Sequence, residues 1–177
     1  MKKLLSVLLI TVILVSAVFG LTSCFEEKEG LTPDEFTLGM NDIDDIELVD
    51  LGNNVYSYSE TSEVSWAPAE YTVKCDDDGF ITYVEIKCTD INNEMLSSAE
   101  TLMSIYNSST NENEELAVAC CLLRLDSLCE TVSGNPISVK ESAEMLANGS
   151  TGTYGDWEVS VNKNISGTVV LTATLSK

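Results

Sequence analysis

The sequence predicts an α+β fold, with an antiparallel sheet covered on one face by two to three helices. Residues 70–75 and 80–88, and again residues 156–162 and 167–177, have the alternating apolar and polar pattern of strands with one buried face. Between these stretches, residues 95–148 carry apolar side chains at helical spacing. Because strands precede and follow a block of helices without strand–helix alternation, we expect the sheet to combine an N-terminal and a C-terminal hairpin.

The first expected hairpin turns at Asp78-Gly79, a dipeptide that strongly favours a tight turn. A turn of even length gathers a mainly apolar face of Tyr71, Val73, Cys75, Phe80, Thr82, Val84, Ile86 and Cys88. An odd length would send these side chains to the other face of the sheet. Residues 54–59 and 63–66 are expected to add further strands upstream.

Three helices are expected after this hairpin. The first covers residues 95–106 and ends at the polar run 107–113. The second runs from residue 114 to about 131, and its wide apolar arc predicts contacts on two sides, as in a central helix. The third covers residues 139–148, and its ends are marked by helix-capping residues at positions 138 and 149.

The C-terminal hairpin is expected to join residues 156–162 to residues 167–177. Trp157, Val159 and Val161 alternate with polar residues, which is typical of a strand with one buried face. The sequence therefore predicts that the chain ends in the same sheet in which its first hairpin lies.

The N-terminus has the form of an export signal. Lys2 and Lys3 precede an apolar run over residues 4–19. The run closes with Leu21-Thr22-Ser23-Cys24, which resembles the lipobox of bacterial lipoproteins. The resemblance covers residues 1–24 only, and it implies that residues 1–23 are removed and that Cys24 is lipidated. The alternative is an uncleaved anchor helix, for which the apolar stretch is long enough.

This resemblance implies a membrane anchor and a location outside the cytoplasm. Each buried CH₂ of an acyl chain contributes roughly 0.8 kcal/mol, and two or three chains together hold a protein stably in the bilayer. We therefore expect a protein fixed to the cell membrane through Cys24 and facing away from the cytoplasm.

An acidic linker over residues 24–50 is expected to follow, leaving residues 51–177 as a single domain. Ten of the 29 acidic residues of the chain lie between Glu26 and Asp50, with Lys28 as the one base. The apolar residues after position 42 leave a second possibility for this part of the linker, a short strand or helical turn docked on the domain.

Net charge and composition exclude several classes of function. The chain has 9 basic and 29 acidic residues, a formal charge of -20. Loss of Lys2 and Lys3 with the signal gives 7 − 29 = -22. Such a surface does not bind nucleic acid and is repelled by anionic lipid, so membrane contact should depend on the anchor alone. The chain contains no histidine, which excludes serine–histidine and cysteine–histidine catalysis.

No group of residues predicts a metal or another cofactor. Asp76, Asp78 and Glu85 fit positions of a calcium loop, but Lys74 stands where the first ligand belongs, and a hairpin turn explains the same residues better. The sole arginine, Arg124, is expected on a solvated helix face or, alternatively, as an anion clamp. A carbohydrate platform is one possible use of the aromatic residues Tyr56, Tyr58, Trp66, Tyr154 and Trp157, although core packing is more common.

Without Cys24, five cysteines remain: Cys75, Cys88, Cys120, Cys121 and Cys129. An odd number prevents complete pairing within the chain. Spacing along a strand or helix excludes pairs of Cys75 with Cys88 and of Cys121 with Cys129, while bridges from Cys88 to Cys121 or Cys129 remain open. The favoured interpretation is five reduced thiols packed as small apolar residues.

These observations favour a non-enzymatic binding or interaction module held at the membrane. The alternative is a cell-surface hydrolase that uses paired carboxylates or a cysteine thiol. Such an enzyme is expected to show two acids facing each other in a cleft, at least one of them with a strongly shifted pKa. A third possibility, a structural role in an envelope assembly, predicts self-association.

Overall fold

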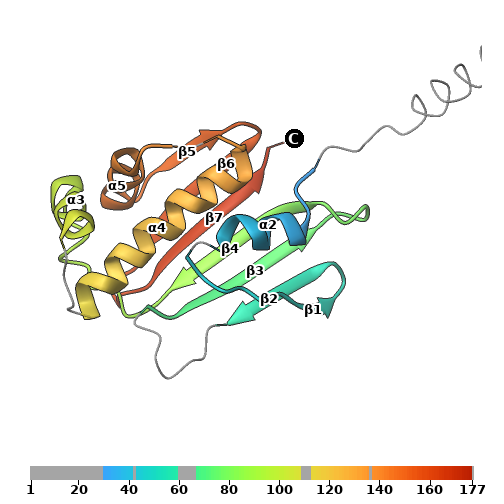
Figure 1. The fold of residues 1–177 in the computed structure, drawn as a ribbon, viewed down its shortest axis with the longest axis horizontal. Coiled ribbons are helices and arrows are strands. Elements are labelled where there is room, and N and C mark those ends of the chain that lie inside the picture. Colours follow the sequence, from blue (N-terminus) through green and yellow to red (C-terminus); the bar gives the residue numbers. More distant parts are fainter. Residues whose placement is uncertain (1–29, 42, 60–66, 109–112, 136, 177) are drawn as a thin grey trace, which may run out of the picture. The chain divides into compact units, whose positions relative to one another are not determined.

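A computed structural model describes residues 30–41, 43–59, 67–108, 113–135 and 137–176 (Figure 1). Residues 31–177 form one compact unit. The helices are α2 (Pro33–Met40), α3 (Ala99–Asn107), α4 (Asn113–Ser133) and α5 (Val139–Asn148). The strands are β1 (Val49–Gly52), β2 (Val55–Ser59), β3 (Ala69–Cys75), β4 (Ile81–Cys88), β5 (Thr151–Tyr154), β6 (Trp157–Lys163) and β7 (Val169–Leu175).

The strands form one antiparallel sheet in the order β1-β2-β3-β4-β7-β6-β5, so the predicted α+β class is confirmed. The sheet is larger than the two expected hairpins, because β4 pairs with β7 and joins them edge to edge. In that junction Ile86 lies opposite Leu171. The sequence analysis missed β5, which extends the sheet beyond β6.

The register of the first hairpin is the one predicted for an even-length turn. Tyr71 pairs with Ile86 and Val73 pairs with Val84, and all four side chains are buried. A shift in register after Lys74 then changes the end of the hairpin. As a result Ile81 is buried, while Phe80, predicted on the core face, is only half-buried.

Residues 31–50 of the predicted linker belong to the domain, including the part expected to be a solvated spacer. Thr32 caps α2 in a reciprocal capping box with Glu35, and Pro33 occupies the first turn. Phe36 and Met40 are fully buried against the core. The domain therefore begins at Leu31, and the predicted boundary between residues 50 and 51 is corrected.

Helix α4 is the central helix, as its wide apolar arc predicted. It contacts α2, α3 and α5 and also β5, β6 and β7. In Figure 1 it crosses in front of the sheet, with α2 beside one half of it and α3 and α5 beside the other. Helix α5 has the predicted bounds, with Ser138 as its N-cap and Gly149 in the left-handed conformation at its C-cap.

The hydrophobic core is built from alternate residues of the strands and the inward faces of the helices. On β6, Trp157, Val159 and Val161 are buried while Glu158 and Ser160 between them are more exposed. The predicted one-sided strand is thereby confirmed at these positions. The predicted strand 63–66 and the predicted signal and lipidation site at Cys24 lie outside the described residues.

Candidate functional site

The most unusual feature of the described chain is a buried ion pair beneath α4. The side chain of Arg124 is 1% exposed and that of Asp44 is 8% exposed. Arg124 Nε donates a hydrogen bond to Asp44 Oδ2 at 2.6 Å, and Nη2 donates to Oδ1 at 2.8 Å. This two-pronged geometry is the strongest arrangement available to a guanidinium and a carboxylate.

Asp44 reaches Arg124 because it continues the helical spacing of the buried residues of α2. Phe36, Met40 and Asp44 recur every four residues, and the turn continues past α2 because the Asp44 backbone N–H donates to the Met40 carbonyl at 3.1 Å. On α4, Arg124 lies one turn after the buried residue Cys121 and one turn before Leu128. Both side chains are therefore directed between α2, α4 and the sheet.

Tyr71 on β3 completes the coordination of the Asp44 carboxylate. Its hydroxyl donates a hydrogen bond to Asp44 Oδ2, and its ring lies 6.0 Å from that of Tyr58 in a tilted arrangement. Burial, together with the negative charge of Asp44, raises the pKa of Tyr71 well above its usual range. Tyr71 therefore remains a protonated donor at every pH at which the fold is stable.

Two cysteine thiols adjoin the guanidinium. Arg124 Nη1 lies 4.0 Å from Cys88 Sγ, and the thiols of Cys88 and Cys121 are hydrogen-bonded to each other. The hydrogen bond from Cys121 lowers the pKa of Cys88 despite burial, and the nearby Arg124 charge acts in the same direction. The interaction with Cys88, together with burial, raises the pKa of Cys121.

The cluster of Asp44, Tyr71, Cys88, Cys121 and Arg124, called the arginine cluster below, satisfies its own charges. Burial alone would lower the pKa of Arg124, but the hydrogen bonds to Asp44 and the electrostatic contributions of Cys88, Tyr71 and Asp44 together outweigh it, and the pKa is raised. A charge that is buried and fully paired contributes to a unique packing arrangement but presents nothing to a substrate. The expected solvated position of Arg124 is therefore wrong, and the anion that it holds is a carboxylate of its own chain.

The aspartate-rich hairpin is stabilised by turn chemistry. Asp76 Oδ1 accepts hydrogen bonds from the backbone N–H groups of Asp78 at 3.0 Å and Phe80 at 2.9 Å. Glu85 accepts a hydrogen bond from the Tyr83 hydroxyl at 2.8 Å. These residues are occupied within the hairpin itself, and the part of the chain that the structure describes contains no group of three or more potential metal ligands.

The aromatic residues considered for a carbohydrate platform belong mainly to the core. Tyr154 and Trp157 are buried, and Tyr56 and Tyr58 are half-buried and packed against the core. Trp66 lies outside the described residues. The four described residues therefore do not form an exposed platform.

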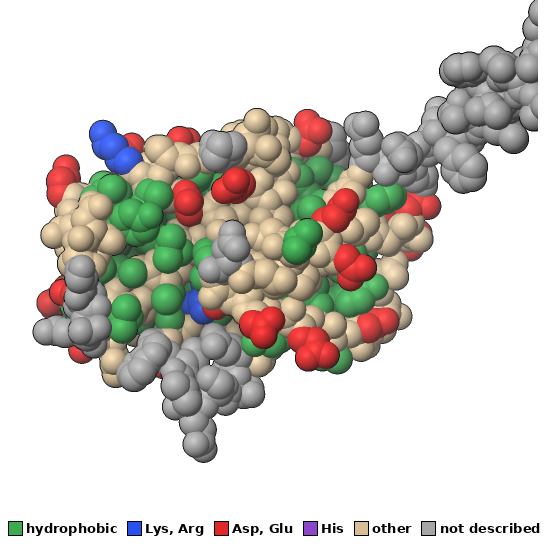
Figure 2. Space-filling model, in the orientation of Figure 1, with side chains coloured by type: hydrophobic (Ala, Val, Ile, Leu, Met, Phe, Trp, Pro, Cys, Tyr) green, Lys and Arg blue, Asp and Glu red, His purple; other side chains and the backbone are tan. Residues whose placement is uncertain are grey.

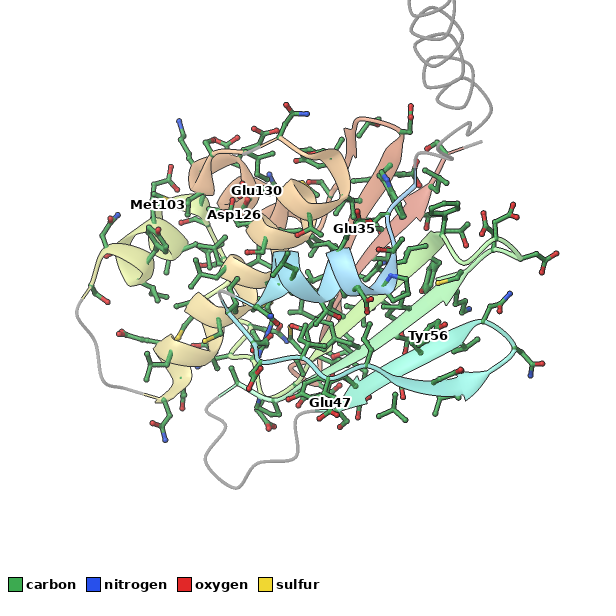
Figure 3. The ribbon with its side chains drawn as sticks, turned by 45° about the vertical axis from the view of Figure 1, so that its right-hand side comes forward. Glu35, Glu47, Tyr56, Met103, Asp126 and Glu130 are labelled. Carbon is green, nitrogen blue, oxygen red and sulfur yellow. The ribbon has the colours of Figure 1, made fainter. Side chains whose placement is uncertain are left out.

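One pair of carboxylates bears on the hydrolase alternative. Asp126 and Glu130 project from α4 one turn apart (Figure 3). Burial raises the pKa of Asp126, whose Oδ1 accepts a hydrogen bond from the Ser142 hydroxyl at 2.9 Å. Glu130 is exposed. The pair lies on one helix instead of facing across a cleft.

An apolar surface lies on the outer side of the helices. Figure 2 shows hydrophobic side chains gathered around α3 and the N-terminal half of α4, with acidic and basic side chains at the edges of this area. The half-buried apolar residues of these helices, called the α3–α4 surface below, are Ala99, Met103, Leu116, Ala119, Cys120 and Leu123. Exposed acids beside them are Glu100, Glu114 and Glu130.

Comparison with known proteins gives no relative. No family model matches the chain, and neither the curated proteins nor the solved structures contain a significant match. Among the described residues, no helix has the length and apolar character needed to cross a bilayer.

Proposed function

We propose that this chain is a lipid-anchored protein outside the cytoplasm that binds a basic partner protein through the α3–α4 surface. The leader ending at Leu21-Thr22-Ser23-Cys24 supports the anchor. The observation that carries the binding proposal is the apolar surface (Figure 2), which shares its two helices with the exposed acids Glu100, Glu114 and Glu130. In this proposal the helices form one layer on a single face of the sheet, and the partner docks on the outer side of that layer.

Charge complementarity defines the partner. Glu100, Glu114 and Glu130 lie around the apolar residues, so a matching surface needs an apolar centre ringed by Lys or Arg. A second copy of this chain fits poorly, since it would bring acids against acids in a protein of net charge -20. Anionic lipid is disfavoured for the same reason.

The hydrolase alternative draws on one observation, the raised pKa of Asp126 near Glu130. The thiols of Cys88 and Cys121 are fully buried and belong to the arginine cluster, where they are not accessible to a substrate. Asp126→Asn removes one of the two ionisable groups of this pair. Normal partner binding by this variant would show that binding does not depend on the carboxylate that a hydrolase would need.

The anchor is tested by intact mass spectrometry of the membrane fraction. The expected species begins at Cys24 and carries acyl chains, while Cys24→Ala should retain the leader and lack the added mass. Cys75→Ala is the matched control, because it removes a thiol from β3 and should leave processing unchanged. Wild-type chain that keeps residues 1–23 would contradict the anchor.

Binding is tested with two synthetic amphipathic helical peptides that share one leucine face, one flanked by Lys and the other by Glu. Isothermal titration should detect only the Lys peptide, with affinity falling as salt rises. Reversal of the rim by Glu100→Lys with Glu114→Lys should weaken binding at least about tenfold. Ile165→Glu, at a fully exposed apolar residue between β6 and β7, is the control and should have no effect.

Two results would contradict the partner class. Equal binding of both peptides would remove the role of the acidic rim. The second result is that neither peptide binds, while sedimentation shows self-association that Leu123→Glu weakens. This would identify a second copy of the chain as the occupant of the surface.

A further inference from the structure

Two buried thiols from distant parts of the chain meet between the sheet and α4. Cys88 is the last residue of β4, Cys121 lies in the first half of α4, and neither is exposed. Their thiols are hydrogen-bonded to each other, and Arg124 Nη1 stands 4.0 Å from Cys88 Sγ. A disulfide requires this kind of close approach between two elements.

The positions of the other described cysteines favour Cys121 as the partner of Cys88. Ala69 is the residue of β3 that pairs with Cys88, and Cys75 lies six residues further along that strand, about 20 Å away at 3.3 Å per residue. Cys129 lies about 12 Å from Cys121 along α4, at 1.5 Å per residue. Cys120 precedes Cys121 on α4 but is half-buried on the α3–α4 surface.

We propose that Cys88 and Cys121 are the site of a disulfide that forms when the chain folds in the presence of a disulfide-carrying oxidant, either a protein thiol oxidase or a small disulfide. The inference is independent of the partner-binding surface. It also does not require the lipid anchor, since any compartment or buffer with such an oxidant suffices.

The reaction is a pair of thiol–disulfide exchanges. The Cys88 thiolate attacks one sulfur of the oxidant, forms a mixed disulfide and expels the other sulfur as a thiolate. Cys121 then loses its proton and attacks the Cys88 sulfur, which expels the second oxidant sulfur. Two protein thiols lose two electrons and two protons, and the disulfide of the oxidant becomes two thiols.

The reverse order, with Cys121 as the first nucleophile, gives the same products. Because both sulfurs are fully buried, the exchange belongs to the folding chain, and the folded reduced protein should react slowly.

The bond would link β4 to α4 and close a loop between positions 88 and 121. A loop of this size predicts a melting temperature higher by roughly 5–15 °C in the oxidised protein than in the reduced one. Of the five described cysteines, none of which is in a disulfide in this structure, three would then remain reduced.

The test refolds the full chain with oxidised or reduced glutathione, blocks thiols with iodoacetamide and maps peptides without reduction. The expected result is one linked pair, Cys88 with Cys121, and a mass lower by two hydrogens. Cys121→Ala should abolish the link. Cys120→Ala, at the adjacent position, is the control and should retain it.

The wild-type peptide map does not depend on whether a variant folds. A different pair in the oxidised, folded wild-type chain would overturn the proposal, as would a full set of alkylated thiols. A link in the Cys121→Ala variant that joins Cys88 to Cys129 would also overturn the assignment of Cys121 as the natural partner.

Discussion

The arginine cluster shows how a single buried charge depends on residues from three separate parts of the chain. Asp44 neutralises Arg124, and Tyr71 from β3 occupies a further lone pair of the carboxylate. Removal of one member of such a pair leaves an uncompensated charge in the core, which costs far more than the pair itself contributes.

We therefore expect Asp44→Ala to lower the free energy of unfolding by about 3–5 kcal/mol. Asp44→Leu combined with Arg124→Met removes both charges and should cost much less than the single change. Urea unfolding followed by circular dichroism measures both. Glu70→Ala, which breaks the exposed pair with Lys87, is the control and should cost at most about 1 kcal/mol. Equal losses for Asp44→Ala and the double variant would contradict the paired-charge explanation.

The arginine cluster could not be predicted from the sequence. Arg124 stands between Leu123 and Leu125 in a helix whose apolar arc is wide. In such a helix the sequence does not show whether a given residue faces the core or the solvent. Asp44 is one of ten acids in a short segment, and it is distinguished only by lying four residues after Met40 and eight residues after Phe36. The proximity of Cys88 and Cys121 was easier to foresee, because the sequence analysis had kept a bridge between Cys88 and either Cys121 or Cys129 as possible.

Turns and caps decide where the elements begin and end. The predicted register of β3 against β4 is present, but it does not come from an even-length turn. Asp76 bonds to Phe80 around an odd-length turn, and the register shift after Lys74 restores the pairing of Tyr71 with Ile86. In contrast, β5 escaped prediction, since Thr151-Gly152-Thr153-Tyr154 is short and contains a glycine, and only its pairing with β6 makes it a strand.

Two glycines with similar backbone conformations allow a matched test of a close contact. Gly79 has φ +89° and open space around it, whereas Gly167 has φ +78° and a Cβ there would lie 2.8 Å from the Ile91 carbonyl oxygen. Gly79→Ala should cost about 1–2 kcal/mol through backbone strain alone. Gly167→Ala should cost about 1–3 kcal/mol more through the added overlap. Thermal unfolding compares the two, and equal losses would show that the loop at Ile91 moves aside freely.

At the scale of the whole molecule, the N-terminal segment with α2 is part of the domain core, as the sheet is. The composition of the chain predicted an acidic linker followed by a folded domain that begins at residue 51. The domain begins twenty residues earlier, because Phe36 and Met40 are buried in its core although many acids surround them in the sequence. The number of domains and the fold class were accessible from periodicity. The docking of α2 was not, because it depends on long-range contacts with α4.

We expect a chain of residues 31–177 to fold and a chain of residues 51–177 to fail. The shorter chain lacks α2 and leaves Arg124 buried without Asp44. Amide hydrogen exchange should show protected strands only in the longer chain. Arg124→Met in the shorter chain is the informative control, because partial recovery would assign part of the loss to the unpaired charge. Cooperative unfolding of residues 51–177 at the melting temperature of the longer chain would contradict the corrected boundary.

The start of the domain at Leu31 has a mechanical consequence. The Leu31 carbonyl accepts a hydrogen bond from Ile81 N–H at 2.7 Å, at the turn end of β4. Seven residue steps separate Cys24 from Leu31, a reach of at most about 24 Å. In the proposed lipid-anchored form, the domain would stay within that distance of the bilayer. A force applied through the proposed anchor would enter the domain at Leu31 and reach β4, the middle strand of the sheet, through this hydrogen bond.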